Sequence, residues 1–578
     1  MNIRQIGNFN GDLVTSILHN RGIFDIEKYI NPTCEDDTNI YSIPNITDVC
    51  QIIKKHIGNT IVILVDSDAD GNTSAAIMYK YLKMVNPLAN VKYFIHEHKT
   101  HGLTPQFMEY LEVVKPDLVI VPDAGTNDVE QRETIVKNGM DLIIIDHHNE
   151  DKHCEYGILV NNHAQFPKND INKNLTGAGM TYLVCKALDE LVFYTDRVEE
   201  LKDLAMVGLI GDCASLFENE TRNLCMQAIK NIHSKMIKTV IETNKQDIDN
   251  VTFADMQWGG IIPLINSVVR IGTLEEKETM FKALADIEPD YFTVVQKRKL
   301  NKETRKYEHI DFKLNNCQLA VDYALNCRAR QNKIINDEIK ICDEQFDEKS
   351  GVQIYVVQND ECKILTGLLA NKLTSLWQQP VIVVWELDGK YTGSLRGYEK
   401  TIKNFKKWCE DTELFELVQG HDNAAGVVFD KNSIGLIREK CRNIEPEEFY
   451  YEVDYIYENK ADKNHIYQIH NASHIFKSGI PNPQFAVKNM KLDANQIAWS
   501  KNTLRIKLDG VTYIKFKTPQ EEYLKLIEND EITMDLIGTF SVNEWNNMKF
   551  PQMMISEYEV IDDDDYRNDN IIDFGIFA

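Results

Sequence analysis

Residues Ile143 to Asn149 read IIIDHHN, in which three β-branched residues precede Asp146, His147 and His148. The apolar run has the length and composition of a strand buried on both faces, so the polar triplet is expected at its carboxyl end. By itself, a pair of neighbouring histidines is more often solvated or satisfied by hydrogen bonds than a set of ligands. The surroundings of the triplet therefore decide its role.

The same strand pattern recurs along the first 150 residues. Apolar runs of strand length lie at 60–65, 91–95, 118–121 and 142–145, and helical segments begin near Ser74 and Glu130. Strands that alternate with helices predict a parallel sheet with helices on both faces. Such α/β sheets bind ligands beyond the carboxyl ends of their strands.

Acidic side chains gather at this edge. Asp66, Asp68 and Asp70 follow the first strand, Asp123 follows the third, and Asp212 ends a later apolar segment expected at the same rim. A single Asp after a strand is usually a turn former or a helix N-cap. So many carboxylates together would repel one another unless cations neutralised them. Oxygen ligands with imidazoles favour Mn²⁺ or Mg²⁺, and two such ions support hydrolysis of a phosphoester.

Composition narrows the class of protein. The chain has 578 residues, 43% hydrophobic and 26% charged, which is enough for three or four globular domains. No apolar run approaches the ~20 residues of a membrane span and no signal-peptide pattern is present, so a cytoplasmic location without membrane contact is expected. Twelve cysteines without metal-ligand spacing indicate free thiols. The net charge of -26 argues against a broad basic surface, but local basic grooves remain compatible with it.

Four motifs resemble those of the DHH phosphoesterase superfamily and, within it, the RecJ single-strand-specific exonucleases. They are DSDADGNTS from Asp66, PDAG from Pro122, the triplet at 146–148 and GLIGDCASL from Gly208, in the family's order. The stretches 172–184 (NKNLTGAGMTYLV) and 263–270 (PLINSVVR) are similar to further family segments. The resemblance implies a metal-dependent exonuclease on single-stranded DNA, acting from the 5′ end, in DNA repair, recombination or replication.

Carried over residue by residue, the resemblance implies two divalent ions, Mn²⁺ or Mg²⁺. The ligands that it implies are Asp68, Asp70, Asp123, His147 and Asp212. Asp123 would bridge the ions, Asp68 would complete one site, and the other three would complete the second.

Four neighbouring positions complete the implied site. His148 would face the scissile phosphate, and Asp146 would orient a histidine by accepting its second ring proton. Asp66 is a further candidate ligand, because Leu64 stands where many relatives carry a histidine.

The resemblance extends over the rest of the chain. It implies a catalytic domain with an N-terminal cap at 1–284, a helical linker at 285–345, a smaller α/β domain of the DHHA1 type at 346–448, an OB-like β-barrel at 449–561 and an acidic tail at 562–578. The charged linker helix is also typical of a solvated face. Five strands are predicted in the barrel, whose aromatic and basic residues would stack bases and follow phosphates, although each aromatic alone is more typical of a core.

Two stretches of the second α/β domain are candidates for holding the substrate. The segment 393–396 (GSLR) offers a hydroxyl and a guanidinium, interpreted as lying on a glycine turn, and 420–426 (GHDNAAG) is similar to the family's GGHxxAAG loop. A hairpin turn and an ordinary strand start are the simpler interpretations. With the resemblance, Ser394 and Arg396 are expected to bind a terminal phosphate, and His421 the cleaved one.

The loop 94–103 (FIHEHKTHGL) departs from the family pattern. Relatives tend to carry an Arg before Tyr-Gly-Leu, whereas this chain has His98 and His101. His98 and Arg270 are further candidates for contacting the substrate.

The tail and two other functions remain open at this point. Residues 562–578 (DDDDYRNDNIIDFGIFA) are interpreted either as disordered or as a peptide that docks a replication or repair protein. The chain is alternatively a phosphodiesterase of oligonucleotides or cyclic dinucleotides, against which the OB-like domain argues. A non-catalytic DNA-binding replication scaffold is the third interpretation, against which the full ligand set argues.

Overall fold

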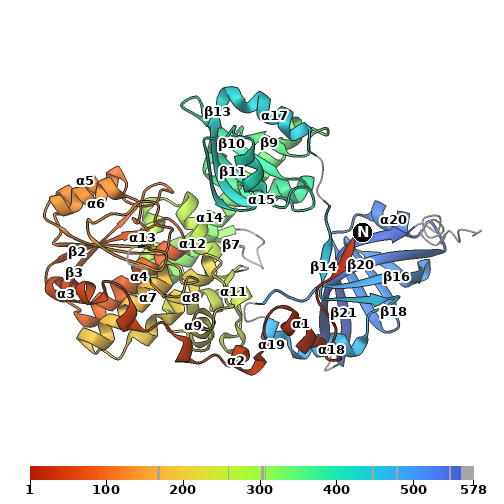
Figure 1. Ribbon diagram of the computed structural model, residues 1–578, viewed down its shortest axis with the longest axis horizontal. Helices are drawn as coiled ribbons and strands as arrows, with labels where there is room; N and C mark the ends of the chain where they lie inside the picture. The colour runs from red at the N-terminus through yellow and green to blue at the C-terminus, as the bar shows by residue number, and fades with distance from the viewer. Residues whose placement is uncertain are drawn as a thin grey trace, which may run out of the picture. The chain divides into compact units, whose positions relative to one another are not determined.

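The computed structural model describes residues 1–165, 169–257, 259–300, 305, 307–444, 448–476, 480–545 and 548–561 (Figure 1). They form two compact units, one made of residues 1–32 with those from 448 on, and the other of Thr33–Glu447. The predicted acidic tail at 562–578 lies outside the described residues. None of the helices in these ranges has the length and apolarity needed to cross a bilayer.

The first α/β domain contains the parallel sheet that the sequence predicts. Its strand order is β3 (Asn90–Ile95), β2 (Thr60–Val65), β4 (Leu118–Pro122), β5 (Asp141–Asp146) and β6 (Ile158–Asn161). All four neighbouring pairs are parallel. The carboxyl ends of all five strands therefore lie at one edge.

Helices cover both faces of this sheet, as expected. The helices concerned are α4 (Ala69–Val85), α5 (Pro105–Val114), α6 (Val129–Lys137), α7 (Gly177–Leu188) and α8 (Lys202–Gly211). Val62 and Leu64 of β2 pack into a cluster with residues of α5 and α6. The alternate residues of β2 pack into a larger cluster with α4, α7 and α8. Full burial on both faces explains why the strand reads as a continuous apolar run.

The predicted helical linker is wrong in its first half. Helices α12 (Ile261–Ile271) and α13 (Leu274–Leu284) are followed by an antiparallel hairpin of β7 (Phe292–Leu300) and β8 (Tyr307–Asn315), and only then by the long helix α14 (Asn316–Ile339). In β8 the apolar residues Ile310, Phe312 and Leu314 alternate with polar ones, which is the period of a strand. The high charge of the segment obscured this alternation.

The second α/β domain has a mostly antiparallel sheet. Its order is β12 (Leu417–His421), β13 (Ala424–Asp430), β11 (Lys390–Arg396), β10 (Val381–Leu387) and β9 (Gln353–Val356). Only β9 and β10 run parallel.

The segment 393–396 therefore lies in a strand, and the interpretation as a flexible glycine turn is wrong. A Cβ at Gly393 would lie 2.0 Å from the carbonyl oxygen of Val383, so this glycine allows close approach of β10 rather than a turn. The segment 420–426 spans the hairpin between β12 and β13.

The other unit contains a seven-stranded sheet. Its order is β15 (Tyr455–Glu458), β16 (Phe485–Asp493), β20 (Glu531–Trp545), β21 (Met548–Ile561), β19 (Val511–Phe516), β18 (Thr503–Leu508) and β17 (Ile497–Ser500). All five predicted strands are present, with β15 and β17 in addition.

The first 32 residues were predicted to be part of the catalytic domain, but they belong to this unit. Strand β1 (Ile3–Gln5) pairs with β14 (Tyr451–Val453), beside it in Figure 1. Helix α1 (Leu13–Asn20) contributes to the same apolar core as Phe485. Arg21 also forms an ion pair of 2.8 Å with Asp454. These contacts join segments more than 400 residues apart, which no local pattern reveals.

Candidate metal centre

The parallel sheet delivers its acidic residues to a single edge. Asp66 follows β2, and Asp68 caps α4 by accepting a hydrogen bond of 2.9 Å from the backbone of Gly71. Asp123 follows β4, and its backbone N–H donates to the carbonyl of Ile145 at 2.7 Å. Asp146 is the last residue of β5. The predicted convergence of these strand ends is present.

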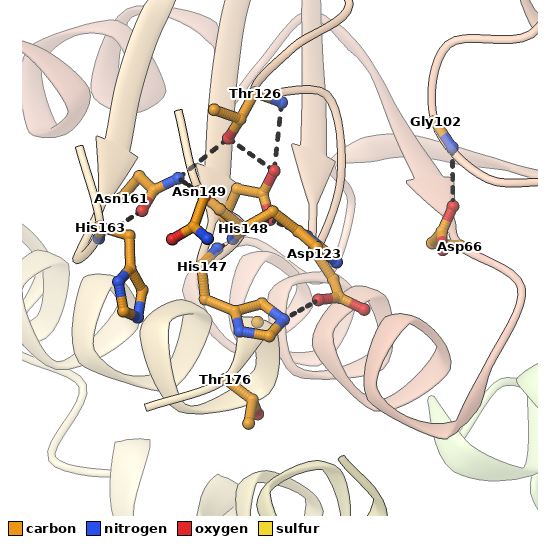
Figure 2. A network of polar contacts seen from close by, with 12 residues as sticks. Asp66, Gly102, Asp123, Thr126, His147, His148, Asn149, Asn161, His163 and Thr176 are labelled. Atoms are coloured by element: carbon orange, nitrogen blue, oxygen red, sulfur yellow. Dashed lines mark hydrogen bonds and ion pairs between the residues drawn. The ribbon is translucent and has the colours of Figure 1, made fainter. Parts of the chain in front are cut away.

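His147 lies among three carboxylates from different elements. Its Nε2 atom is 3.3 Å from Asp123 Oδ1 (Figure 2). The same atom is 3.8 Å from both Asp70 Oδ2 and Asp212 Oδ2. One ligand atom from each of Asp70, His147 and Asp212 lies within 4.8 Å of the others. This spacing suits ligands of one cation.

The carboxylate of Asp70 is fixed by the start of α7. It accepts hydrogen bonds from Thr176 Oγ1 at 2.7 Å, Gly177 N at 2.7 Å and Ala178 N at 3.0 Å. The exposed N–H groups of a helix start favour negative charge, so the carboxylate is held in one orientation. The stretch 172–184 thus orients the site.

Two glycines let the backbone approach these carboxylates. A Cβ at Gly177 would lie 2.3 Å from Asp123 Oδ1, and one at Gly208 would lie 2.3 Å from Asp70 Oδ1. No larger residue fits at either position without displacing a site residue. The glycines of the TGAG and GLIG motifs are therefore required by packing around the site.

Asp123 is the most constrained residue of the site. It has a positive φ of 65°, which is uncommon for a residue with a side chain, and it is only 2% exposed. Its buried Oδ1 atom accepts no hydrogen bond from any residue that the structure describes, although His147 Nε2 lies 3.3 Å away. Burial raises the pKa of this carboxyl well above its usual range, and the charges of Asp70, Asp68 and Asp66 raise it further. A buried carboxylate oxygen without a donor, among other carboxylates, fits a divalent cation as its partner.

Asp212 stands at the C-cap of α8, where the helix dipole disfavours an anion. Burial raises its pKa to about 6, with Asp70 adding to the effect. Burial likewise raises the pKa of Asp68. Carboxylates in such positions are costly unless a cation neutralises them.

Asp146 holds His148, and one of its oxygens also lies within 4.8 Å of ligand atoms of Asp123 and His147. Its Oδ1 lies 2.8 Å from His148 Nδ1, while Oδ2 accepts from Thr126 Oγ1 at 2.6 Å and Thr126 N at 3.1 Å (Figure 2). Burial opposes ionisation of Asp146, but the hydrogen bonds from His148 and Thr126 outweigh it and lower the pKa of the carboxyl. The same contact raises the pKa of His148 to about 9. The contact with Asp146 thus orients the ring of His148 and favours its protonated form.

Asp66 faces the loop that follows β3. It accepts from Gly102 N at 2.9 Å, and its Oδ2 lies 2.5 Å from His101 Nδ1. Ligand atoms of Asp66, Asp68 and His101 all lie within 4.8 Å of one another. Sequence reasoning assigned no role to His101, Thr126 or Thr176. Thr126 directly follows PDAG (122–125) and Thr176 is the first residue of TGAG (176–179), which was the available signal.

The substrate candidates are distributed over both α/β domains. Arg270 at the end of α12 is close enough for the charge of Asp68 to act on its guanidinium, whose pKa burial lowers. Burial also lowers the pKa of Arg396, and the charge of Arg270 adds to this. Ser394 is 3.0 Å from Thr366 Oγ1, and His421 is exposed at the end of β12. His98 is exposed. Its neighbour Lys99 in the 94–103 loop is a cation close enough for the charge of Asp68 to act on its amine.

Family comparisons agree with this geometry. The model of the DHH family, N-terminal domain, matches residues 60–209, and that of the RecJ OB domain matches 457–557. YorK, an SPbeta prophage-derived protein of Bacillus subtilis (strain 168) whose name describes a single-strand DNA-specific exonuclease, is 31% identical over 592 residues. The alignment covers 97% of this chain and 98% of YorK.

More distant relatives have the same architecture. The single-stranded-DNA-specific exonuclease RecJ of Bacillus subtilis is 22% identical, over 95% of this chain and 68% of RecJ. The crystal structure of RecJ in complex with Mn²⁺ from Thermus thermophilus superposes with a TM-score of 0.71 and 18% identity, over 94% of this chain and 75% of RecJ.

The sheet, the acidic edge and the OB domain define a protein of the DHH class. The extent of the similarity to YorK narrows this assignment. The chain belongs to the RecJ-like members of the DHH family.

Proposed function

We propose that this protein is a metal-dependent exonuclease that hydrolyses phosphodiester bonds of single-stranded DNA. The observation that carries the proposal is the buried Asp123 Oδ1 atom, which accepts no hydrogen bond within the described part of the chain and lies among carboxylates, 3.3 Å from His147 Nε2. The names of YorK and RecJ as single-strand DNA exonucleases, and the RecJ structures with Mn²⁺ and Mg²⁺, support the same chemistry.

Two divalent ions, Mn²⁺ or Mg²⁺, fit the donor set. The residues that would hold them are Asp66, Asp68, Asp70, Asp123, His147 and Asp212. When bound, such ions supply the Lewis acidity that activates water and stabilises the leaving oxygen of a phosphodiester. Thr176 and the start of α7 keep Asp70 oriented throughout.

His148 is placed to bind the scissile phosphate. Its Nδ1 is engaged by Asp146, so Nε2 is the ring atom left for a phosphate oxygen. With a pKa of about 9 the ring is protonated at neutral pH and donates a charge-assisted hydrogen bond. Asp146 keeps the ring in this orientation.

The strand itself would be held by cations further from the reacting phosphorus. Arg270 and Arg396 act on each other electrostatically, and the hydroxyl of Ser394 lies two residues before Arg396 on β11. We propose that Ser394 and Arg396 bind the terminal phosphate of the strand and His421 the cleaved phosphate, and that His98 and Arg270 are further contacts to the substrate. We also propose that digestion runs from 5′ to 3′ and that the activity serves DNA repair, recombination or replication.

The test is a cleavage assay with Mn²⁺ and end-labelled single-stranded, duplex and dinucleotide substrates. Wild type is expected to degrade the single strand, and Asp123→Ala to lose this activity. Asp337→Asn, on the exposed face of α14 beside Lys340, is the matched control and should retain it. Blocking either end of the strand determines the polarity.

Other outcomes would favour the other functions. Cleavage of dinucleotides alone would indicate a small-substrate phosphodiesterase, and binding without cleavage would indicate a scaffold. Asp123→Ala that remains as active as wild type would contradict the proposed mechanism.

Two further properties are proposed with the activity. All twelve cysteines are free, which suits the reducing cytoplasm. The tail at 562–578 is proposed to dock a replication or repair protein. Deleting it should abolish that association while cleavage of naked DNA continues, and binding of every such partner to the truncated chain would remove the proposal.

A further inference from the structure

The loop between β3 and α5, residues 96–104, covers the Asp66 side of the site. Strands β2 and β3 are parallel neighbours in the register Val65↔Ile95, so the residues that follow them emerge together. Side chains alternate along β2, and Asp66 continues the face that carries Val62 and Leu64. This face lies beneath the loop.

The loop is anchored so that one of its histidines meets Asp66. Leu103 is 3% exposed and shares an apolar cluster with Leu64 and Phe107. Leu64 has no atom that could bind a metal ion. Its side chain instead helps to anchor the loop through this apolar cluster. The backbone N–H of Leu103 also donates to Asp128 Oδ2 at 2.8 Å.

Gly102 sets the turn immediately before this anchor. It has a φ of +73°, and a Cβ at this position would lie 2.4 Å from Asp128 Oδ2. Its N–H reaches Asp66 Oδ1 while His101 Nδ1 reaches Asp66 Oδ2. Because the backbone N–H groups of Gly102 and Leu103 are both hydrogen-bonded, the imidazole of His101 is held against the carboxylate of Asp66.

Asp123 follows β4, the strand next to β2, and lies beside this group of side chains. Asp123 is 2% exposed, and its Oδ1 atom, which lies 3.3 Å from His147 Nε2, accepts no hydrogen bond from the residues that the structure describes. In Figure 2 one of its oxygens faces His147 and the other is directed to the side on which Asp66 lies. Asp123 therefore presents charge to both sides of the centre, although His147 serves only one of them.

We infer that His101, together with Asp66 and Asp68, binds one of the two divalent ions through its imidazole. Two carboxylates and one imidazole within 4.8 Å form a donor set suited to Mn²⁺, with coordination positions left for water and substrate. His147 and His101 would then each serve one ion, on opposite sides of Asp123. The inference rests on the two-metal function proposed above.

The first test counts the Mn²⁺ ions bound by the full-length protein, from the loss of the free-ion EPR signal. Wild type is expected to bind two ions. His101→Ala should raise the dissociation constant of one ion at least roughly 10-fold and leave the other bound. The matched control is His309→Ala, an exposed histidine of β8, which should still bind two. The ion that remains in His101→Ala reports that the variant is folded.

A second measurement separates a ligand from a hydrogen-bond donor to Asp66. Pulsed EPR of the His147→Ala protein with Mn²⁺ should show nitrogen coupling from His101, and adding His101→Ala should remove it. Two ions at wild-type affinity in His101→Ala, or coupling that persists in the double variant, would overturn the inference alone. Wild type that binds no Mn²⁺ would overturn the proposed function itself.

Discussion

The two five-stranded sheets of the Thr33–Glu447 unit differ in strand direction, and their polar side chains are arranged accordingly. All strands of the first sheet are parallel, so Asp66, Asp123 and Asp146 leave three neighbouring strands at one edge. In the second sheet β10, β11, β13 and β12 alternate in direction, and Ser394 and Arg396 lie within or at the end of one strand. Parallel topology concentrates charge at one place, whereas the antiparallel sheet offers separate contacts.

The difference in strand direction therefore suggests a different role for each of the two sheets. The edge of the parallel sheet brings buried carboxylates within a few ångströms, where only cations make them tolerable. The second sheet presents a guanidinium and a hydroxyl suited to holding a phosphate. Changes at the first sheet should therefore abolish the chemistry, and changes at the second should weaken binding.

The largest effect is expected from Gly177→Ala. The new methyl would lie 2.3 Å from Asp123 Oδ1 and displace the carboxylate, so cleavage should fall by more than about 100-fold. Overpacking should also lower the free energy of unfolding by about 1–3 kcal/mol. Cleavage rates and denaturant unfolding measure the two effects.

The control for Gly177 lies in the second domain. Gly435, in helix α17 (Ile434–Arg442), has open space where a Cβ would be added. Gly435→Ala should leave cleavage unchanged and raise stability by roughly 0.5–1 kcal/mol. If Gly177→Ala and Gly435→Ala cleaved DNA equally fast, this result would contradict the proposed difference between the two sheets.

Thr126→Val is expected to have the next largest effect. It removes the hydroxyl that donates to Asp146 at 2.6 Å and leaves a carboxylate oxygen short of a donor in a buried position. Because Asp146 orients His148, kcat should fall roughly 10- to 100-fold. Single-turnover kinetics on labelled single strands measure this, with Thr126→Ser, which keeps the hydroxyl, expected to recover most of the activity.

Arg396→Ala should act mainly on substrate binding. Loss of one charge-assisted hydrogen bond to phosphate should raise KM for single-stranded DNA roughly 10-fold and leave kcat near wild type. Arg438→Ala, at an exposed position of α17, is the control and should change neither constant. A fall in kcat without a change in KM would place Arg396 in the chemistry instead.

The smallest effect is one of pH on stability. Lys277 of α13 donates to the carbonyls of His96 at 3.2 Å and Glu97 at 2.7 Å, and burial lowers the pKa of its amine to about 8. Between this value and the ordinary pKa of about 10.4, the unfolded chain binds more protons, so stability rises with pH. Relative to Lys277→Met, wild type should gain on the order of 2 kcal/mol between about pH 7.5 and 10.

A lysine of the second sheet should show the opposite sign. The exposed Lys390 pairs with Glu416 at 2.5 Å, which raises the pKa of its amine. Its contribution to stability is present at neutral pH and is lost as the pH rises through the raised pKa.

The test of the Lys277 prediction is the free energy of unfolding of wild type and of Lys277→Met, measured as a function of pH. If the two curves were parallel, they would contradict the assignment of a buried charge beneath the 96–104 loop.

Sequence patterns predicted what depends on local periodicity. The apolar runs and the alternation with helices were enough to place Asp66, Asp123 and Asp146 at one edge, because parallel strands share their carboxyl ends. His101 was not predicted, since its approach to Asp66 depends on how Leu103 packs into the apolar cluster that also contains Leu64. Packing of this kind has no signature in the order of residues.

Long-range pairing was equally hidden. The pairing of Ile3 with Tyr451 joins the two ends of the chain, and nothing near either residue indicates it. The hairpin of β7 and β8 was missed for another reason, because its charges resemble those of a solvated helix although its apolar residues alternate with period two.

The edge of the parallel sheet is proposed to hold two metal ions bridged by Asp123. Anomalous diffraction from crystals of the full-length protein grown with Mn²⁺ is the decisive measurement. Two peaks are expected about 3.5–4 Å apart on either side of the Asp123 carboxylate, one of them beside His147. Peaks elsewhere, or no peak within reach of Asp123, would contradict the proposed two-metal centre.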